Sequence, residues 1–264
     1  MMRSLYSAVS GLQAHQTKMD VIGNNIANVN TTGFKKDKVT FQDLLSEAAG
    51  HTADRGGFNS IQIGSGVMVG SVDTMHTQGA VATTGCNTHL MIQGEGFFVL
   101  QGLDGEQYYT RAGAFSFDEE GYLVNSANGM YVLDADEHEI HIDDIENVKN
   151  ISISPDGMIN YIDENGDAQQ LADPIALAKF ANPAGLNRAG ENLFAESNNS
   201  GAATIEAPGI DGRGKLIANV LEMSNVDLSE EFVDMIVTQR GFQANSRTIR
   251  VSDEMLQELI NLKR

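Results

Sequence analysis

Residues 225–264, NVDLSEEFVDMIVTQRGFQANSRTIRVSDEMLQELINLKR, decide the fold of this chain. The stretch holds no proline, so one helix can run through it. Asp227 is the expected N-cap, with Glu230 as its capping-box partner, and Lys263 and Arg264 place positive charge in the last turn, where the helix dipole favours it. A helix of about 36 residues would be roughly 54 Å long at ~1.5 Å per residue. That length predicts a coiled coil or a bundle.

Apolar side chains in this stretch recur at steps of three and four, as on the buried face of a helix. A second apolar row makes the face wider than one neighbouring helix would cover. Packing only within its own domain is the alternative. We predict helix packing and polymerisation through Leu228, Phe232, Met235, Phe242, Ile249, Leu256 and Leu259. The polar residues of the first row, Gln239, Ser246 and Asp253, are expected to set the register.

The opening of the chain offers a partner helix. Residues 1–28 also lack proline and carry apolar residues at steps of three and four. Gly11 and Gly23 each cost about 1 kcal/mol relative to Ala in a helix, so this helix should need packing to be stable. The residues predicted to pack are Leu5, Val9, Leu12, Ile22 and Ile26. We therefore predict that the two ends of the chain pair with each other.

Charge separates the middle of the chain from its ends. Residues 41–215 hold seven basic and 26 acidic residues and thus account for the whole net charge of −19. All four prolines lie in the same part. The ends therefore look suited to burial and the middle to water. An acidic surface also argues against nucleic acid as a partner.

Several other classes are excluded by the same composition. No stretch approaches 18 apolar residues, so no membrane span is expected, and the N-terminus lacks the apolar core and cleavage site of a signal peptide. A single cysteine, Cys86, excludes an internal disulfide framework. Because its flanking residues offer no basic neighbour but His89, a buried or unreactive thiol is expected.

The middle of the chain predicts strands. Residues 41–63 form a polar, Gly-containing linker, and from Gly64 onward short β-branched runs alternate with glycine turns. Hairpin turns are expected at Asp156–Gly157 and Asn165–Gly166. We predict an α+β fold, with paired terminal helices like a coiled coil and an inserted, mainly-β domain. The expected boundaries are 1–40 with 216–264 for the helices, 41–63 for the linker and 64–215 for the β-domain.

Both ends carry recognisable motifs. Residues 4–34, SLYSAVSGLQAHQTKMDVIGNNIANVNTTGF, and residues 224–249, SNVDLSEEFVDMIVTQRGFQANSRTI, resemble the terminal motifs of bacterial flagellar rod and hook proteins. MIQGEGFFVL and YTRAGAFSFDEEGYLV resemble segments of the β-domain of that family. The turn of the first motif contains Asn24, Asn25, Asn28, Gly33 and Phe34, residue types that cap turns and tolerate left-handed backbone.

The resemblance implies a structural subunit, not an enzyme. It implies a homopolymer in the form of a helical tube, with outward-facing β-domains of the short, single-domain type. Expected partners are the chain itself, the rod and hook–filament junction proteins, the hook cap and the type III export apparatus. The expected place is the extracellular flagellum, reached without a cleaved signal peptide. The TQRGFQANSR core is most similar to that of hook subunits, so a torque-transmitting hook subunit is expected, with a distal rod subunit as the alternative.

Two acidic clusters deserve a test as metal sites, and neither is predicted to be one. His138 and His141 are three residues apart and would point to opposite faces of a strand, although Asp134, Asp136, Asp143 and Asp144 are near. Asp163, Asn165 and Asp167 begin like a calcium loop, but the glycine comes one place early and no bidentate Glu follows. We predict no catalytic, cofactor-binding or metal site. A secreted binding module on a coiled-coil stalk is the remaining alternative, and it predicts a small closed oligomer.

Overall fold

The computed structural model describes residues 2–48, 62–102, 104–142, 148, 150–163, 168–171 and 173–262. The chain divides into two compact units, each described by itself below. The helical unit comprises Met1–Ala27, Asp37–Thr74 and Asp227–Arg264. The β unit comprises Asn28–Lys36 and Met75–Val226.

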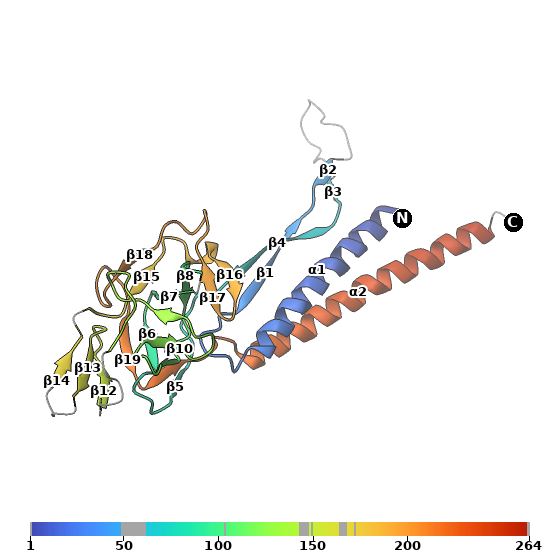
Figure 1. The fold of residues 1–264 in the computed structure, drawn as a ribbon. Coiled ribbons are helices and arrows are strands. Elements are labelled where there is room, and N and C mark those ends of the chain that lie inside the picture. Colours follow the sequence, from blue (N-terminus) through green and yellow to red (C-terminus); the bar gives the residue numbers. More distant parts are fainter. Residues whose placement is uncertain are drawn as a thin grey trace. The chain divides into compact units, whose positions relative to one another are not determined.

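Two long helices dominate the helical unit. Helix α1 covers Met2–Ala27 and α2 covers Leu228–Asn261. They lie side by side and antiparallel, with the start of α1 and the end of α2 at the same end of the pair (Figure 1). Asp227 is the N-cap of α2, since its carboxylate accepts a hydrogen bond from the Ser229 amide at 2.8 Å. The predicted pairing of the terminal helices is therefore confirmed. Neither described helix has a segment apolar enough to cross a bilayer.

Two antiparallel hairpin pairs complete the helical unit (Figure 1). Strand β1 (Asp37–Asp43) pairs with β4 (Val67–Thr74), and β2 (Ser46–Ala48) pairs with β3 (Gln62–Gly64). The predicted linker 41–63 thus contains strand residues at both of its described ends, from β1 and β2 at one end and from β3 at the other. Residues 49–61 of that linker lie outside the described residues.

The β unit is built mainly on one antiparallel sheet. Among the described residues its strand order is β16-β17-β8-β7-β11-β10-β9, with β15 paired to both β7 and β18. The bounds are β7 Phe97–Gln101, β8 Gln107–Thr110, β9 Phe115–Phe117, β10 Leu123–Asn125, β11 Tyr131–Val132, β15 Leu177–Lys179, β16 Asn187–Gly190, β17 Leu193–Ala195 and β18 Thr204–Glu206.

Smaller sheets and one short helix surround the main sheet. A three-stranded sheet runs in the order β12-β13-β14, and two pairs join β19 to β6 and β20 to β5. The bounds are β5 Val81–Thr83, β6 Leu90–Gln93, β12 Asn150–Ile153, β13 Ile159–Ile162, β14 Ala168–Gln170, β19 Lys215–Ala218 and β20 Val220–Glu222; η2, a 3₁₀ turn, covers Pro183–Gly185.

Strand β7 is buried on both of its faces. Successive side chains of a strand point to opposite faces. Phe98 and Leu100 accordingly join one apolar cluster, and Phe97 and Val99 join another. The uninterrupted apolar run FFVL therefore reflects a central strand with two covered faces. The core of the β unit is organised around it.

The residues that directly precede α2 in the sequence, 216–226, belong to the β unit. The predicted boundary at 216 assigns residues 216–226 to the helices. In the structure, β19 pairs with β6 and β20 pairs with β5, because Leu216 and Leu221 bury their side chains in the β unit. The predicted fold class, α+β with an inserted β-domain, is confirmed.

One of the two predicted hairpin turns can be compared with the structure. The β12–β13 hairpin turns at Asp156–Gly157: the Gly157 amide donates to the Ser154 carbonyl at 2.9 Å, and Gly157 has φ +85°. That prediction is confirmed. The turn expected at Asn165–Gly166 lies outside the described residues, although the flanking strands β13 and β14 pair antiparallel.

We expect the stability of a β-unit fragment to depend on whether it keeps the segments by which the chain enters and leaves the unit. Fragment 28–226 retains Lys35, Leu216 and Glu222, all buried, whereas fragment 65–215 loses all three. Fragment 28–226 should resist proteolysis and unfold cooperatively, and 65–215 should melt at least about 10 °C lower, since several kcal/mol of burial is lost. Thermal unfolding and limited proteolysis of the pair provide the measurement. Equal melting temperatures would contradict the assignment of both ends to this unit.

Candidate assembly surface and motif turn

The face of α2 that packs on α1 is polar. Its buried residues are Glu231, Thr238 and Ser252, with Asn245 half-buried at the same spacing of seven residues. The predicted polar row of Gln239, Ser246 and Asp253 lies one residue further along, which is about 100° around the helix. Gln239 and Asp253 are exposed. The buried polar row of α2 is thus offset by one residue from the row expected to set the register, whose role stays a prediction.

Glycines let the two helices approach closely. A Cβ added at Gly11 would lie 2.5 Å from Asn245 Nδ2, and one added at Gly241 would lie 2.7 Å from the His15 ring. By helix propensity alone Gly11 is only a cost, but in the structure it makes room for the Asn245 side chain of the partner helix. Burial, and then the charge of Lys18, lower the pKa of His15, so the ring packs on Gly241 as a neutral group at pH 7.

Polar contacts fix the register of the antiparallel pair. Lys18 Nζ lies 3.5 Å from Asp234 Oδ2. Asn25 Nδ2 donates to Glu231 Oε2 at 3.3 Å and to the Asp37 carbonyl at 2.9 Å, while Asn25 Oδ1 accepts from the Asp37 amide at 3.0 Å. Asn25 is 1% exposed. This motif residue thus joins α1, the start of β1 and the first turn of α2.

Because the inner face is polar, much of the apolar surface of α2 remains uncovered. Among the described residues, its large apolar side chains that are more than about a third exposed are Leu228, Phe232, Val233, Ile236, Val237, Phe242, Val251, Met255, Leu259, Ile260 and Leu262; we call these the exposed apolar row. An apolar surface of this extent on one helix is typical of an interaction site.

The predicted packing residues divide between the two surfaces. Ile22 is buried, and Leu5, Leu12, Ile26, Met235, Ile249 and Leu256 are half-buried. Val9, Leu228, Phe232, Phe242 and Leu259 are exposed. Only part of the predicted set is therefore covered within one chain, and its role in polymerisation stays a prediction.

The rest of the motif turn packs within the β unit. Gly33 has φ +70°, and its amide donates to the Glu222 carbonyl at 2.8 Å. A Cβ on Gly33 would lie 2.5 Å from the Ala112 amide nitrogen. Asn28 accepts from the Thr31 amide through its carbonyl, at 3.2 Å, and so closes the turn. Asn24, the remaining member of the predicted set, is exposed on α1.

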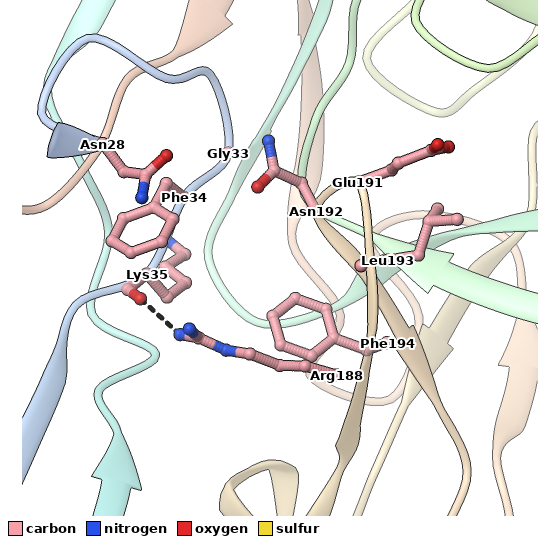
Figure 2. A pocket seen from close by; sticks show the side chains of 10 residues that line it. Asn28, Gly33, Phe34, Lys35, Arg188, Glu191, Asn192, Leu193 and Phe194 are labelled. Atoms are coloured by element: carbon pink, nitrogen blue, oxygen red, sulfur yellow. Dashed lines mark hydrogen bonds between the residues drawn. The ribbon is translucent and has the colours of Figure 1, made fainter. Parts of the chain in front are cut away.

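Phe34 is buried beneath an arginine of strand β16. The guanidinium of Arg188 lies 5.3 Å from the Phe34 ring centre, and Arg188 Nη2 donates to the Lys35 carbonyl at 2.7 Å. Figure 2 shows these groups around a cavity of about 160 Å³. Asn192 Nδ2 reaches across to the Thr32 carbonyl at 3.1 Å. The β16–β17 hairpin thereby holds the motif turn on the β unit.

A buried charge cluster lies next to this turn. Lys35 Nζ donates to Glu222 Oε1 at 2.5 Å and to the Thr77 carbonyl at 2.7 Å. Arg111 Nη1 lies 3.4 Å from Glu222 Oε2. The Lys35 and Glu222 side chains are fully buried, and that of Arg111 is 4% exposed. Burial lowers the pKa of Lys35 and of Arg111, and Glu222 opposes both shifts.

His76 lies beside the charge cluster. Its ring is edge-on to Phe97 and Phe194, with centroid distances of 5.4 and 5.5 Å. Burial first, and then the positive charges of Lys35 and Arg111, lower its pKa to about 4. The Pro183 main chain favours the imidazolium, but neither ring nitrogen reaches hydrogen-bond geometry with the described residues. His76 is therefore a neutral, half-buried group at pH 7.

The residues examined as metal ligands have structural contacts. Asp134 Oδ1 accepts from the Asp136 amide at 3.0 Å and the His138 amide at 2.8 Å, so it closes a turn. His141 Nε2 lies 2.9 Å from the Glu120 carbonyl. Within the described ranges no three metal-ligating side chains come together; Asp143, Asp144, Asn165 and Asp167 lie outside those ranges. Cys86 is exposed; of the expected buried or unreactive thiol, burial is thus wrong, and the lack of reactivity stays a prediction.

Three family models match separate parts of the chain. Residues 5–35 match the family model described as flagella basal body rod protein, and residues 217–262 match that of the flagellar basal body rod FlgEFG protein C-terminal region. Residues 91–161 match the flagellar hook protein FlgE/F/G D1 domain. The chain is 49% identical to the flagellar basal-body rod protein FlgG of Bacillus subtilis, with both chains covered completely.

The chain belongs to the flagellar hook and basal-body rod family. The resemblance of both terminal motifs to this family is thereby confirmed. Proteins of the hook and rod family are structural subunits of the bacterial flagellum, and this chain is not an enzyme. The chain is also 38% identical to FlgG of Buchnera aphidicola subsp. Acyrthosiphon pisum, over 99% of this chain and all of that one.

Hook proteins are also among the relatives. The flagellar hook protein FlgE of Treponema pallidum is 32% identical, with both chains covered completely. That alignment spans 466 positions, far more than this chain has, so the hook protein holds long segments that this chain lacks. The alignment with the Bacillus subtilis rod protein spans 271.

The buried ionic contacts of the motif turn were not predicted from the sequence. Lys35 and Glu222 are separated by 187 positions, and Arg188 lies in an otherwise polar stretch. One signal was present: Glu222 is a lone acidic residue within the apolar run LIANVLEM. A charge in such a run is costly to bury unless it is paired, and this points to a buried partner.

We expect Gly33→Ala to destabilise the β unit by about 2–4 kcal/mol, since the left-handed backbone is strained by a Cβ and the methyl meets the Ala112 amide. Gly129→Ala is a matched control: Gly129 has φ +69° but nothing within 4 Å of an added Cβ, so only about 1–2 kcal/mol is expected. Five of the six tyrosines lie in the β unit, and their fluorescence can follow its unfolding in urea. Equal losses would refute the role of the close contact.

We expect His76 to make the β unit acid-sensitive. Its folded pKa of about 4 lies below the ordinary 6.5, so the unfolded chain binds the proton first. The contribution to stability is complete above pH 6.5 and is lost as the pH falls towards 4, by about 2–3 kcal/mol at pH 4.5. His76→Gln should flatten this part of the pH dependence.

His138→Gln is the control for that measurement, because the His138 side chain is 79% exposed. This variant should follow the unchanged chain in urea unfolding at pH 7 and pH 4.5. An identical pH dependence in the His76→Gln variant would show that His76 is not responsible.

Proposed function

We propose that this chain is a distal rod subunit of the flagellar basal body, which polymerises with copies of itself through its terminal helices. One observation carries the proposal: α2 presents a long exposed apolar row although it is already paired with α1. Such a surface needs a cover, and a second copy in a heterologous, non-closing arrangement provides one while extending a filament.

The inner face of α2 supports this assignment. Within one chain the helices are joined by small and polar residues, such as Gly11 against Asn245 and Lys18 against Asp234. The apolar residues that provide most burial energy, roughly 1.5–3 kcal/mol each, remain available for neighbours. We assign Val9, Leu228, Phe232, Phe242 and Leu259 to contacts between copies, and Leu5, Leu12, Ile22, Ile26, Met235, Ile249 and Leu256 to the seam or its margin.

The rod assignment rests on length and similarity together. A rod protein matches the chain at 49% identity over nearly equal lengths, whereas the hook relatives from Treponema pallidum and Borreliella burgdorferi align at 32% over 466 and 444 positions. The hook subunit expected from the TQRGFQANSR core is the second candidate, since these relatives are covered completely.

The remaining partners follow from the same proposal. As a rod subunit the chain would meet other rod proteins at one end and hook subunits at the other; as a hook subunit it would meet the hook cap and the junction proteins. In either case it would leave the cell through the flagellar type III export apparatus without a cleaved signal peptide and take its place in the extracellular or basal-body part of the flagellum.

We expect Ile236→Asp to block polymerisation and to leave the monomer folded. Ile236 is 57% exposed, so an aspartate there costs the monomer little, but burying its charge between copies is strongly unfavourable. The critical concentration for filament formation, measured by sedimentation, should rise at least about tenfold, or roughly 1.4 kcal/mol. Gln243→Asp, which adds the same charge at an exposed polar position of α2, is the matched control and should polymerise normally.

Electron microscopy of the filaments separates the two subtypes. Straight tubes are expected of a rod subunit, and curved tubes would replace that assignment with the hook. Normal filaments from the Ile236→Asp variant would show that the exposed apolar row is not the contact between copies.

A further inference from the structure

The β unit contains a second cavity next to its buried charge cluster. It measures about 260 Å³ and is lined by Phe97, Phe180 and Pro183 on its apolar sides. Arg111 lines its inner end, and Lys179 and Glu95 lie at its margin. The Arg111 side chain is 4% exposed, whereas those of Lys179 and Glu95 are 32% and 77% exposed. The cavity thus connects a buried guanidinium with the surface.

The charges around this cavity do not cancel. Inside, two cations, Lys35 and Arg111, share the one carboxylate of Glu222. At the margin, Lys179 pairs with Glu95, with Nζ and Oε2 3.5 Å apart. The group as a whole carries one positive charge in excess. An uncompensated charge that is withdrawn from water is costly, so an anion in the cavity would be stabilised.

Hydrogen-bond donors at the cavity are also unused. Arg111 directs Nη1 to Glu222 and Nη2 to the Gly94 carbonyl, at 2.8 Å. Its Nε is buried and has no hydrogen-bond partner among the described residues. The two ring nitrogens of His76 are also buried and make no hydrogen bond of good geometry with the described residues. A neutral imidazole offers one N–H. The Arg111 Nε–H is therefore available at the cavity, and the His76 ring, which the Pro183 main chain approaches, supplies a second donor beside it.

We propose that this cavity binds a carboxylate carried on an apolar or aromatic body. A carboxylate brings a single negative charge, which matches the single excess positive charge, and two oxygens that accept from the Arg111 Nε–H and the His76 ring. The aromatic walls of Phe97 and Phe180 suit the attached apolar body. A phosphate dianion would leave a net negative charge in the cavity and fits less well.

Two sources can supply this chemistry. One is a free small carboxylate. The other is an aspartate or glutamate side chain of a second copy, since residues 41–215 carry 26 acidic side chains. The site itself does not depend on the proposed function, and the experiment below distinguishes the two sources.

The test uses benzoate as the probe and benzamide, its uncharged counterpart, as the control. The full chain is labelled with ¹⁵N-histidine, and the ring nitrogens of His76, identified with the His76→Gln variant, are followed by NMR during titration. Benzoate should shift these signals and bind at least about tenfold more tightly than benzamide, as a charge-assisted hydrogen bond requires. Equal affinities, or no binding of benzoate, would overturn the proposal.

Two variants remove the site in different ways. Arg111→Met leaves Lys35 and Glu222 as a neutral pair, so the chain should fold, and benzoate affinity should fall at least about tenfold. Ala181→Trp fills the cavity from its exposed margin without touching the charge cluster; Ala184→Trp, at an exposed residue of η2 that does not line the cavity, is its control. Unchanged benzoate affinity in both Arg111→Met and Ala181→Trp would also overturn the proposal.

Filament formation then identifies the source. If the carboxylate belongs to a second copy, benzoate should raise the critical concentration of the unchanged chain, and Ala181→Trp should raise it relative to Ala184→Trp. If a free carboxylate is the ligand, filament formation should be the same in all these cases while benzoate binding is lost only in the cavity variants.

Discussion

One buried carboxylate, Glu222, holds together parts of the β unit that are distant in sequence. Its Oε1 accepts from Lys35 Nζ and from the Gly79 amide, its Oε2 faces Arg111, and its main-chain carbonyl accepts from Gly33. Removal of one partner of such a buried pair typically costs about 3–5 kcal/mol, because the other charge remains without compensation. Lys35 lies eight residues after α1 ends and Glu222 six residues before α2 begins. The inserted domain is thus closed where the chain enters and leaves it.

The helical unit divides its surfaces in an unusual way. In an ordinary amphipathic helix the apolar stripe packs inside and polar residues face water. In α2 the buried residues are Glu231, Thr238 and Ser252, whereas the apolar residues of the exposed apolar row are uncovered within the chain. Specific polar contacts and close glycine approaches define one register, whereas non-directional apolar burial is left for other surfaces. This division allows α1 and α2 to pair in a defined register while apolar surface of α2 stays exposed for contacts with other chains.

Much of this arrangement could be predicted from sequence, and the failures have identifiable causes. Both helices, the N-cap at Asp227 and the turn at Asp156–Gly157 depend on local signals, which sequence shows directly. The buried row of Glu231, Thr238 and Ser252 was not predicted, because it shares its spacing of seven residues with an apolar row of the same helix. Periodicity alone cannot say which row meets the partner helix. The use of Gly11 for close packing likewise depends on Asn245, more than 200 positions away.

The charge distribution would limit lateral aggregation between copies that expose this much apolar surface. If copies join through α2, cohesion comes from the exposed apolar row, while residues 41–215 bring the whole net charge of −19. Like charges separated by less than the Debye length of about 8 Å repel at physiological salt. Burial of the exposed apolar row between copies is favourable, whereas sideways contacts between acidic domains bring like charges together. Growth along a filament is then favoured over lateral aggregation, because attraction and repulsion reside on different parts of the same chain.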